Sequence, residues 1–273
     1  MNPLFKTLDA LRVYRSMIMV SMRGQMQYRA SFIIQTFGHL AATSVEFVAI
    51  YFLFQRFSRL DSWTLPEIAV FFGLVSVSFA LADALGRGFD LFGEQVRTGD
   101  FDRLLLRPRS TVLQLLGQEL TLKRVGRLAQ GAAVTAWGLA TLHFSFTAPK
   151  IALLASIVAG NVGLFLGLVI IQATICFWTV DSIEAMNTLT YGGSFIARYP
   201  LSIYDRWLRR IFTWIVPLAC TNYFPVVALV GRDDPLGSPI WFQWIAPAAG
   251  LIFLAFALQV WRFGVKRYCS TGS

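Results

Sequence analysis

The feature that most limits the fold of this chain is a succession of apolar runs, each long enough to cross a lipid bilayer. Of its 273 residues 56% are hydrophobic and only 14% are charged, whereas soluble domains usually carry about 25% charged residues. A spanning helix uses roughly 20 mostly apolar residues. The runs predict spans at residues 31–54, 68–85, 111–144, 151–180 and 239–263. We therefore expect residues 1–273 to form a single, all-α integral membrane domain.

The stretch between the last two of these runs allows two interpretations. Hydropathy favours residues 211–230 as a straight fifth span, which leaves residues 181–210 in the cytoplasm. Alternatively, residues 181–198 form a polar fifth span buried in protein, and residues 199–230 dip into the outer leaflet and return. Pro217 and Pro225 favour this second interpretation, because a proline breaks or kinks a helix. Both interpretations give six spans and place both termini on the same side.

The basic residues predict which side that is. With a cytoplasmic N-terminus, 20 of the 24 Lys and Arg residues lie in inner segments if residues 211–230 cross, and 16 if they re-enter. Cytoplasmic loops are rich in Lys and Arg, so we expect both termini inside. The net charge of +9 then reflects orientation and contacts with anionic lipid rather than a nucleic-acid partner.

An amphipathic helix is expected over residues 1–28. Its apolar residues recur every three or four positions, which places them on one stripe of a helix; they are Leu4, Leu8, Leu11, Tyr14 and Ile18. Such a helix lies in the inner membrane interface.

The most informative polar segment is the loop over residues 86–109. Within it, residues 96–108 combine a turn, a short amphipathic helix and a proline stop. A solvated loop has no need for Phe101 or for three consecutive leucines. The segment is therefore either a helix that docks on a cytoplasmic partner or a helix that lies on lipid.

The sequence of this loop also resembles a known family. Residues 99–108, GDFDRLLLRP, are similar to a motif in the inner loop of ABC-2-type transporter permeases, in their bacterial six-helix branch. Tyr199-Pro200, Trp207-Leu208-Arg209, Pro217 and Pro225 resemble the stretch before the last span of that branch, and residues 268–273 resemble its ending. The resemblance runs from about residue 10 to the C-terminus.

This resemblance implies an exporter fold with an N-terminal interface helix, a cytoplasmic coupling helix and outer re-entrant helices before the last span. It therefore favours the second interpretation of residues 181–230. Two permease chains, identical or paralogous, would pair with two copies of a separate ATPase in the bacterial inner membrane, and the ATPase would bind ATP and Mg. The coupling residues would be Phe101, Asp102, Arg103, Leu104 and Leu105, with Asp102 and Arg103 in polar contacts and the leucines filling a groove of the partner.

Ionisable residues inside or beside the spans are candidates for a substrate path, because they are costly in lipid and usually face protein or water. His39 and Glu46 are seven positions apart and share a helix face, Asp83 lies near the inner end of its span, and Glu119 lies near the start of the third. The alternative is that they form interhelical hydrogen bonds, or that their carboxyl groups are neutral at physiological pH. Glu46 suggests an amphipathic or cationic cargo, such as a drug or a lipid-like molecule.

Catalysis in this chain is not expected. The sequence has no phosphate-binding loop of the type GxxxxGK[ST], and two histidines and three scattered cysteines suggest neither a metal site nor a disulfide. A serine protease built on Ser194 would lack a basic partner. The remaining rival is an ATP-independent transporter or channel, which usually has an internal repeat that we do not find here.

Overall fold

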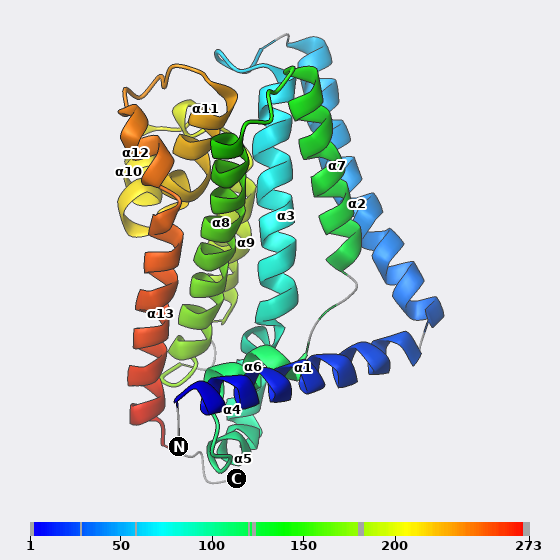
Figure 1. Cartoon of the computed structure of the whole chain (residues 1–273), viewed down its shortest axis with the longest axis vertical. Coiled ribbons are helices and arrows are strands. Elements are labelled where there is room, and N and C mark those ends of the chain that lie inside the picture. The colour runs from blue at the N-terminus through cyan, green and yellow to red at the C-terminus, as the bar shows by residue number, and fades with distance from the viewer. Residues whose placement is uncertain are drawn as a thin grey trace.

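The computed structural model (Figure 1) describes residues 3–27, 29–57, 59–119, 121, 124–179 and 183–269, and throughout these residues the chain is all-α. The longer helices are α1 (Pro3–Gln27), α2 (Arg29–Arg56), α3 (Leu65–Asp90), α7 (Val125–Thr141), α8 (Ala148–Ile175), α9 (Ile183–Ala197) and α13 (Ala248–Arg267). The shorter helices and turns are α4 (Phe92–Arg97), α5 (Asp100–Leu105), α6 (Thr111–Gln118), η3 (Leu201–Ile203), α10 (Arg206–Arg210), η4 (Ile211–Ile215), η5 (Ala219–Tyr223), α11 (Phe224–Val230) and α12 (Ile240–Ile245).

α3 lies at the centre of the bundle, between α7 and α8 (Figure 1). It is buried on every side, with Ile68, Phe71 and Phe72 at 0% exposure, as expected for a helix that is apolar all round. Glycines let its neighbour approach closely: a Cβ on Gly73 would lie 2.6 Å from the carbonyl oxygen of Gly131 in α7. This packing fixes α7 against α3, which matters for the polar side chains that both helices carry.

Four described helices are long and apolar enough to cross a membrane: α2, α3, α8 and α13. The spans expected at residues 31–54 and 68–85 lie inside α2 and α3, and α8 ends at Ile175, before the expected limit at residue 180. α7 has 17 residues and α9 has 15, which is short for a helix that must cover roughly 20 residues to span. The first two residues of the span expected at 181–198 lie outside the described residues.

The span expected at residues 111–144 is interrupted. α6 ends at Gln118, Glu119 has an extended backbone, and α7 begins only at Val125. α6 packs closely against the C-terminal end of α3, since a Cβ on Gly88 would lie 2.0 Å from the carbonyl oxygen of Leu115. Hydropathy predicted one continuous span here because the residues of both α6 and α7 are mostly apolar.

The last expected span, at residues 239–263, is also displaced. α12 ends at Ile245, and α13 runs from Ala248 to Arg267 after a break at Pro247. Proline lacks the N–H that would continue the helix. The long helix α13 therefore begins later and extends further than the span expected from hydropathy.

The two ends of the bundle differ in construction (Figure 1). α1 lies across one end, where α4, α5, α6 and the C-terminal end of α13 also lie. At the opposite end α10, α11 and α12 lie together. The segments Arg206–Ile215 and Ala219–Val230 are bent by 83° at the break between them, where Pro217 sits. Residues 211–230 therefore do not form the straight helix that hydropathy favours.

Polar contacts hold the bent element to the start of α3. The indole Nε1 of Trp63 donates a hydrogen bond to Oγ of Ser202 at 2.9 Å. The guanidinium of Arg232 lies 4.4 Å from the Trp63 ring and 3.1 Å from a carboxylate oxygen of Glu67. Glu67 in turn accepts a hydrogen bond from the backbone N–H of Thr64 and so caps α3.

Candidate functional site

The segment from α4 to α6 projects at the end of the molecule where α1 lies (Figure 1). α4 and α5 are joined by a turn in which Gly99 has φ 74°, a backbone conformation that glycine adopts without strain. The side-chain Nε2 of Gln114 donates to the carbonyl oxygens of Leu104 and Arg109, at 3.2 and 3.1 Å. These bonds tie the end of α5 to α6.

Phe101 anchors α5 to the rest of the chain. It is 0% exposed, and its ring centroid lies 4.9 Å from that of Phe92, 5.0 Å from Tyr268 and 5.6 Å from Phe177. Trp261 belongs to the same cluster, at 6.3 Å. Because Trp261 lies on α13 and Tyr268 directly follows it, these ring contacts join α5 to that helix.

The five expected coupling residues therefore divide into two groups. Phe101 and Leu104 are buried within this chain, at 0% and 9% exposure, so they are not free to fill a groove of a partner. Asp102 is partly exposed, while Arg103 and Leu105 are exposed. Sequence reasoning missed Leu106, the most exposed of the three leucines at 85%.

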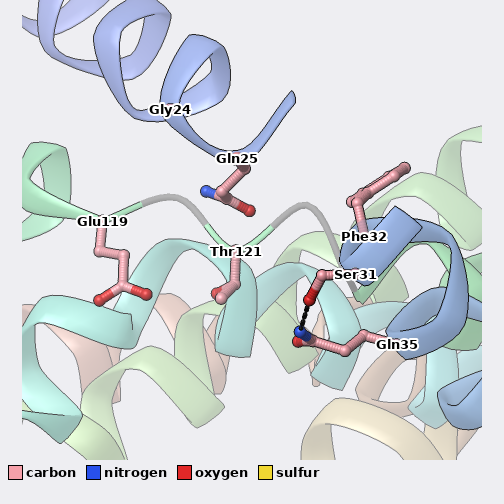
Figure 2. Close-up of a pocket in the computed structure, with 7 residues that line it drawn as sticks. All are labelled: Gly24, Gln25, Ser31, Phe32, Gln35, Glu119 and Thr121. Atoms are coloured by element: carbon pink, nitrogen blue, oxygen red, sulfur yellow. Dashed lines mark hydrogen bonds between the residues drawn. The ribbon is translucent and has the colours of Figure 1, made fainter. Parts of the chain in front are cut away.

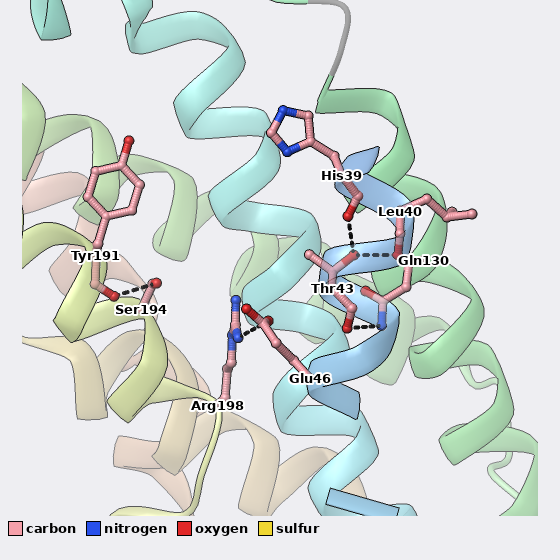
Figure 3. A network of polar contacts seen from close by, with 8 residues as sticks. All are labelled: His39, Leu40, Thr43, Glu46, Gln130, Tyr191, Ser194 and Arg198. Carbon is pink, nitrogen blue, oxygen red and sulfur yellow. Dashed lines mark hydrogen bonds and ion pairs between the residues drawn. The ribbon is translucent and has the colours of Figure 1, made fainter. Parts of the chain in front are cut away.

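A second set of polar side chains lies among α2, α3, α7 and α9, and we call it the polar stripe. On α2 and α9 its members recur at helical spacing and therefore share one face of each helix. Figure 3 shows Glu46 of α2 and Arg198, which directly follows α9, pointing toward each other. The members are His39, Thr43, Glu46, Asp83, Arg124, Arg127, Gln130, Tyr191, Ser194 and Arg198.

Both carboxylates of the polar stripe are paired. Asp83 lies 2.8 Å from Nε of Arg124, and a ring nitrogen of His39 lies 3.4 Å from the same guanidinium. Glu46 lies 2.5 Å from Nη1 of Arg198. Of the four residues expected on a substrate path, His39 and Asp83 thus share Arg124 as a partner, and Glu46 belongs to a separate pair with Arg198.

Arg198 is the most deeply buried of these cations. Its side chain is 4% exposed, whereas that of Glu46 is 32% exposed. The guanidinium also lies 4.9 Å from the ring of Phe72 and 4.6 Å from that of Phe195, within the range of cation–π attraction. The pair joins α2 to the end of α9 across α3.

Glu119 lies apart from the polar stripe. It lines a pocket of about 260 Å³ together with Gln25, Ser31, Gln35 and Thr121, where α1, α2 and the segment before α7 meet (Figure 2). Nε2 of Gln35 donates to Oγ of Ser31 at 2.8 Å. The four expected path residues therefore do not form one continuous path.

The arginines of the polar stripe were missed from the sequence. Arg124, Arg127 and Arg198 lie at the ends of apolar runs, where a basic residue is normally taken as an orientation signal. Arg124 and Arg127 are three positions apart, and this spacing could have indicated that both side chains lie on the same helix face. Among the described residues, no group of three His, Cys, Asp or Glu side chains could hold a metal ion.

Several apolar helices around paired internal charges define a multi-pass membrane protein. A model of the family described as "ABC-2 family transporter protein" matches residues 40–272, and the chain belongs to this family. Members are the membrane component of a transporter, not its ATPase, and they normally work with an ABC ATPase subunit. Comparisons with curated proteins and with solved structures found no match.

Proposed function

We propose that this chain is the permease subunit of an ATP-driven exporter and forms half of its transmembrane pathway. A second permease, identical or paralogous, would supply the other half, and two copies of a separate ATPase would bind ATP and Mg. The observation that carries the proposal is the projecting α5, which is fixed to α13 through Phe101 and exposes Arg103 and Leu105. A short rigid helix of this kind can transmit motion from a docked subunit to a spanning helix.

The six spans of this proposal are α2, α3, α7, α8, α9 and α13, with both termini in the bacterial cytoplasm. The position of α1 across the end that carries α4 and α5 supports this orientation (Figure 1). α1 would lie in the inner interface, and the bent element of residues 199–230 would lie in the outer leaflet as a re-entrant pair of helices. The 83° bend within it supports this placement.

The cargo we propose is an amphipathic, lipid-like or drug-like molecule. The argument for a cationic cargo depended on Glu46 as an unpaired intramembrane carboxylate. Because Arg198 pairs with Glu46 in the structure, that argument loses its force, and the apolar surroundings of the polar stripe are what favour an amphipathic molecule.

Co-purification tests this function. We expect the chain, isolated in mild detergent from its native membrane, to carry a nucleotide-binding subunit in stoichiometric amount. Leu106→Asp places a charge on the most exposed leucine beside α5 and should release that subunit while the permease stays folded. Phe146→Asp is the matched control, because Phe146 is also exposed, at 68%, but joins α7 to α8 at the opposite end.

Isolation without any nucleotide-binding subunit would instead favour an ATP-independent transporter or channel. If the Leu106→Asp variant still retained the subunit, the exporter function would stand, but α5 would not be the helix that docks the ATPase.

A further inference from the structure

The polar stripe carries more positive than negative charge. It contains three arginines, Arg124, Arg127 and Arg198, but only two carboxylates. Asp83 forms an ion pair with Arg124, and Glu46 forms one with Arg198. Arg127 therefore has no carboxylate partner within the polar stripe. In the part of the chain that the structure describes, no carboxylate lies within ion-pair distance of it, and its buried Nε has no hydrogen-bond partner.

The surroundings of Arg127 are apolar on one side and charged on the other. Its guanidinium lies 5.4 Å from the ring centroid of Phe79, which packs against Phe165 and Tyr191 at 5.1 and 5.4 Å. Asp83, Arg124, Arg198 and Glu46 all act on it electrostatically, two attracting and two repelling. Each of the two carboxylates is already paired with another arginine, Asp83 with Arg124 and Glu46 with Arg198.

Arg127 is half-buried, and an arginine partly withdrawn from water in a membrane protein is costly unless a counter-charge accompanies it. Arg127 is the third residue of α7, on the side of the bundle where α1 lies (Figure 1). A small free anion would lose its hydration on reaching this position. If the anionic group belongs to a molecule with a large apolar part, the free energy gained by burying that apolar part offsets the cost of dehydrating the anion.

We propose that Arg127 binds the anionic head group, phosphate or carboxylate, of an amphiphile that reaches the polar stripe from the inner leaflet. This rests on the proposed transport function and narrows its cargo to an anionic class. Arg124 and Arg198 hold the two carboxylates away from the ligand, so that Arg127 remains available. The ion pairs act as positioning contacts, and Arg127 is the residue that touches the ligand.

The test is lipid selectivity, measured on the full-length chain, together with its ATPase where that co-purifies, in phosphatidylcholine bilayers. Spin-labelled phosphatidic acid and spin-labelled phosphatidylcholine with the same acyl chain serve as probes, and the electron paramagnetic resonance spectrum gives their relative association. We expect Arg127→Gln to lower the preference for phosphatidic acid about tenfold, the size of one lost charge-assisted contact. Arg127→Lys should keep most of the preference.

Arg59→Gln is the matched control, because Arg59 is exposed in the loop after α2 and its loss changes the net charge equally. An equal decrease in the Arg59→Gln and Arg127→Gln variants would overturn the proposal, since general charge attraction would then explain the preference. Displacement of the lipid by inorganic phosphate would also overturn it, because the site would then take a free anion. If the glutamine variant does not fold, Arg127→Met keeps the apolar stem and repeats the measurement.

This experiment requires no ATPase and is independent of the co-purification test. If the lipid preference is unaffected while a nucleotide-binding subunit still co-purifies, the anion site is wrong and the exporter remains. If the preference falls as expected and no such subunit is found, the anion site remains and the exporter is wrong.

Discussion

At the scale of single residues, the pair of Glu46 and Arg198 is asymmetric. The arginine side chain is 4% exposed and the glutamate side chain 32%, so the two would behave differently if left alone. An uncompensated buried charge is costly, whereas a partly exposed charge can be hydrated or neutralised. The identity of the partner was not predictable from sequence, since the two residues are 152 positions apart.

We therefore expect Glu46→Gln to destabilise the protein by about 3 kcal/mol, because it leaves Arg198 buried without its counter-charge. Arg198→Met should cost less, about 1 kcal/mol, since it removes the buried charge and leaves the more exposed partner. Thermal unfolding in detergent measures both. The double variant should be more stable than Glu46→Gln alone. Strictly additive losses would show that the two side chains do not interact.

At the scale of elements, sequence patterns located the helices better than their ends and their neighbours. The all-α architecture is confirmed, because long apolar runs in a bilayer have no alternative but to satisfy their backbone groups as helices. The break between α6 and α7 was not predicted, since it depends on how closely α6 approaches Gly88 in α3. The sequence predicted a short amphipathic helix in this loop but could not show that the chain itself covers Phe101 and Leu104.

This difference gives a prediction for α5. Phe101→Ala removes the ring that joins α5 to Tyr268 and Trp261, and a buried phenylalanine truncated to alanine typically costs 3–5 kcal/mol. We expect backbone hydrogen exchange of Asp100–Leu105 to accelerate in this variant while the spanning helices remain protected.

The comparison is Leu106→Ala, which should leave exchange in α5 unchanged, because exposed substitutions usually shift stability by no more than about 0.5 kcal/mol. Similar exchange in the two variants would mean that Phe101 does not anchor α5.

At the scale of the whole molecule, the chain has two unlike ends that are joined by its long helices. One end carries α1 and the projecting α5, and the other carries the bent element that Trp63 and Arg232 fasten to α3. The sequence alone left the side of this element open, because its arginines favoured the cytoplasm and its prolines favoured the outer leaflet. Family membership is confirmed over residues 40–272, while docking and orientation are proposals that labelling can decide.

The most direct measurement is side-specific cysteine labelling in intact cells and in inverted membrane vesicles. In a chain whose Cys176, Cys220 and Cys269 are replaced by serine, single cysteines are introduced as Leu106→Cys and Trp207→Cys, at positions 85% and 62% exposed. We expect a membrane-impermeant maleimide to label position 207 only from outside. Position 106 should be labelled only from the cytoplasmic side and protected when the ATPase is bound. Labelling of both positions from the same side, or no protection of position 106 in the complex, would contradict a permease that docks its ATPase through α5.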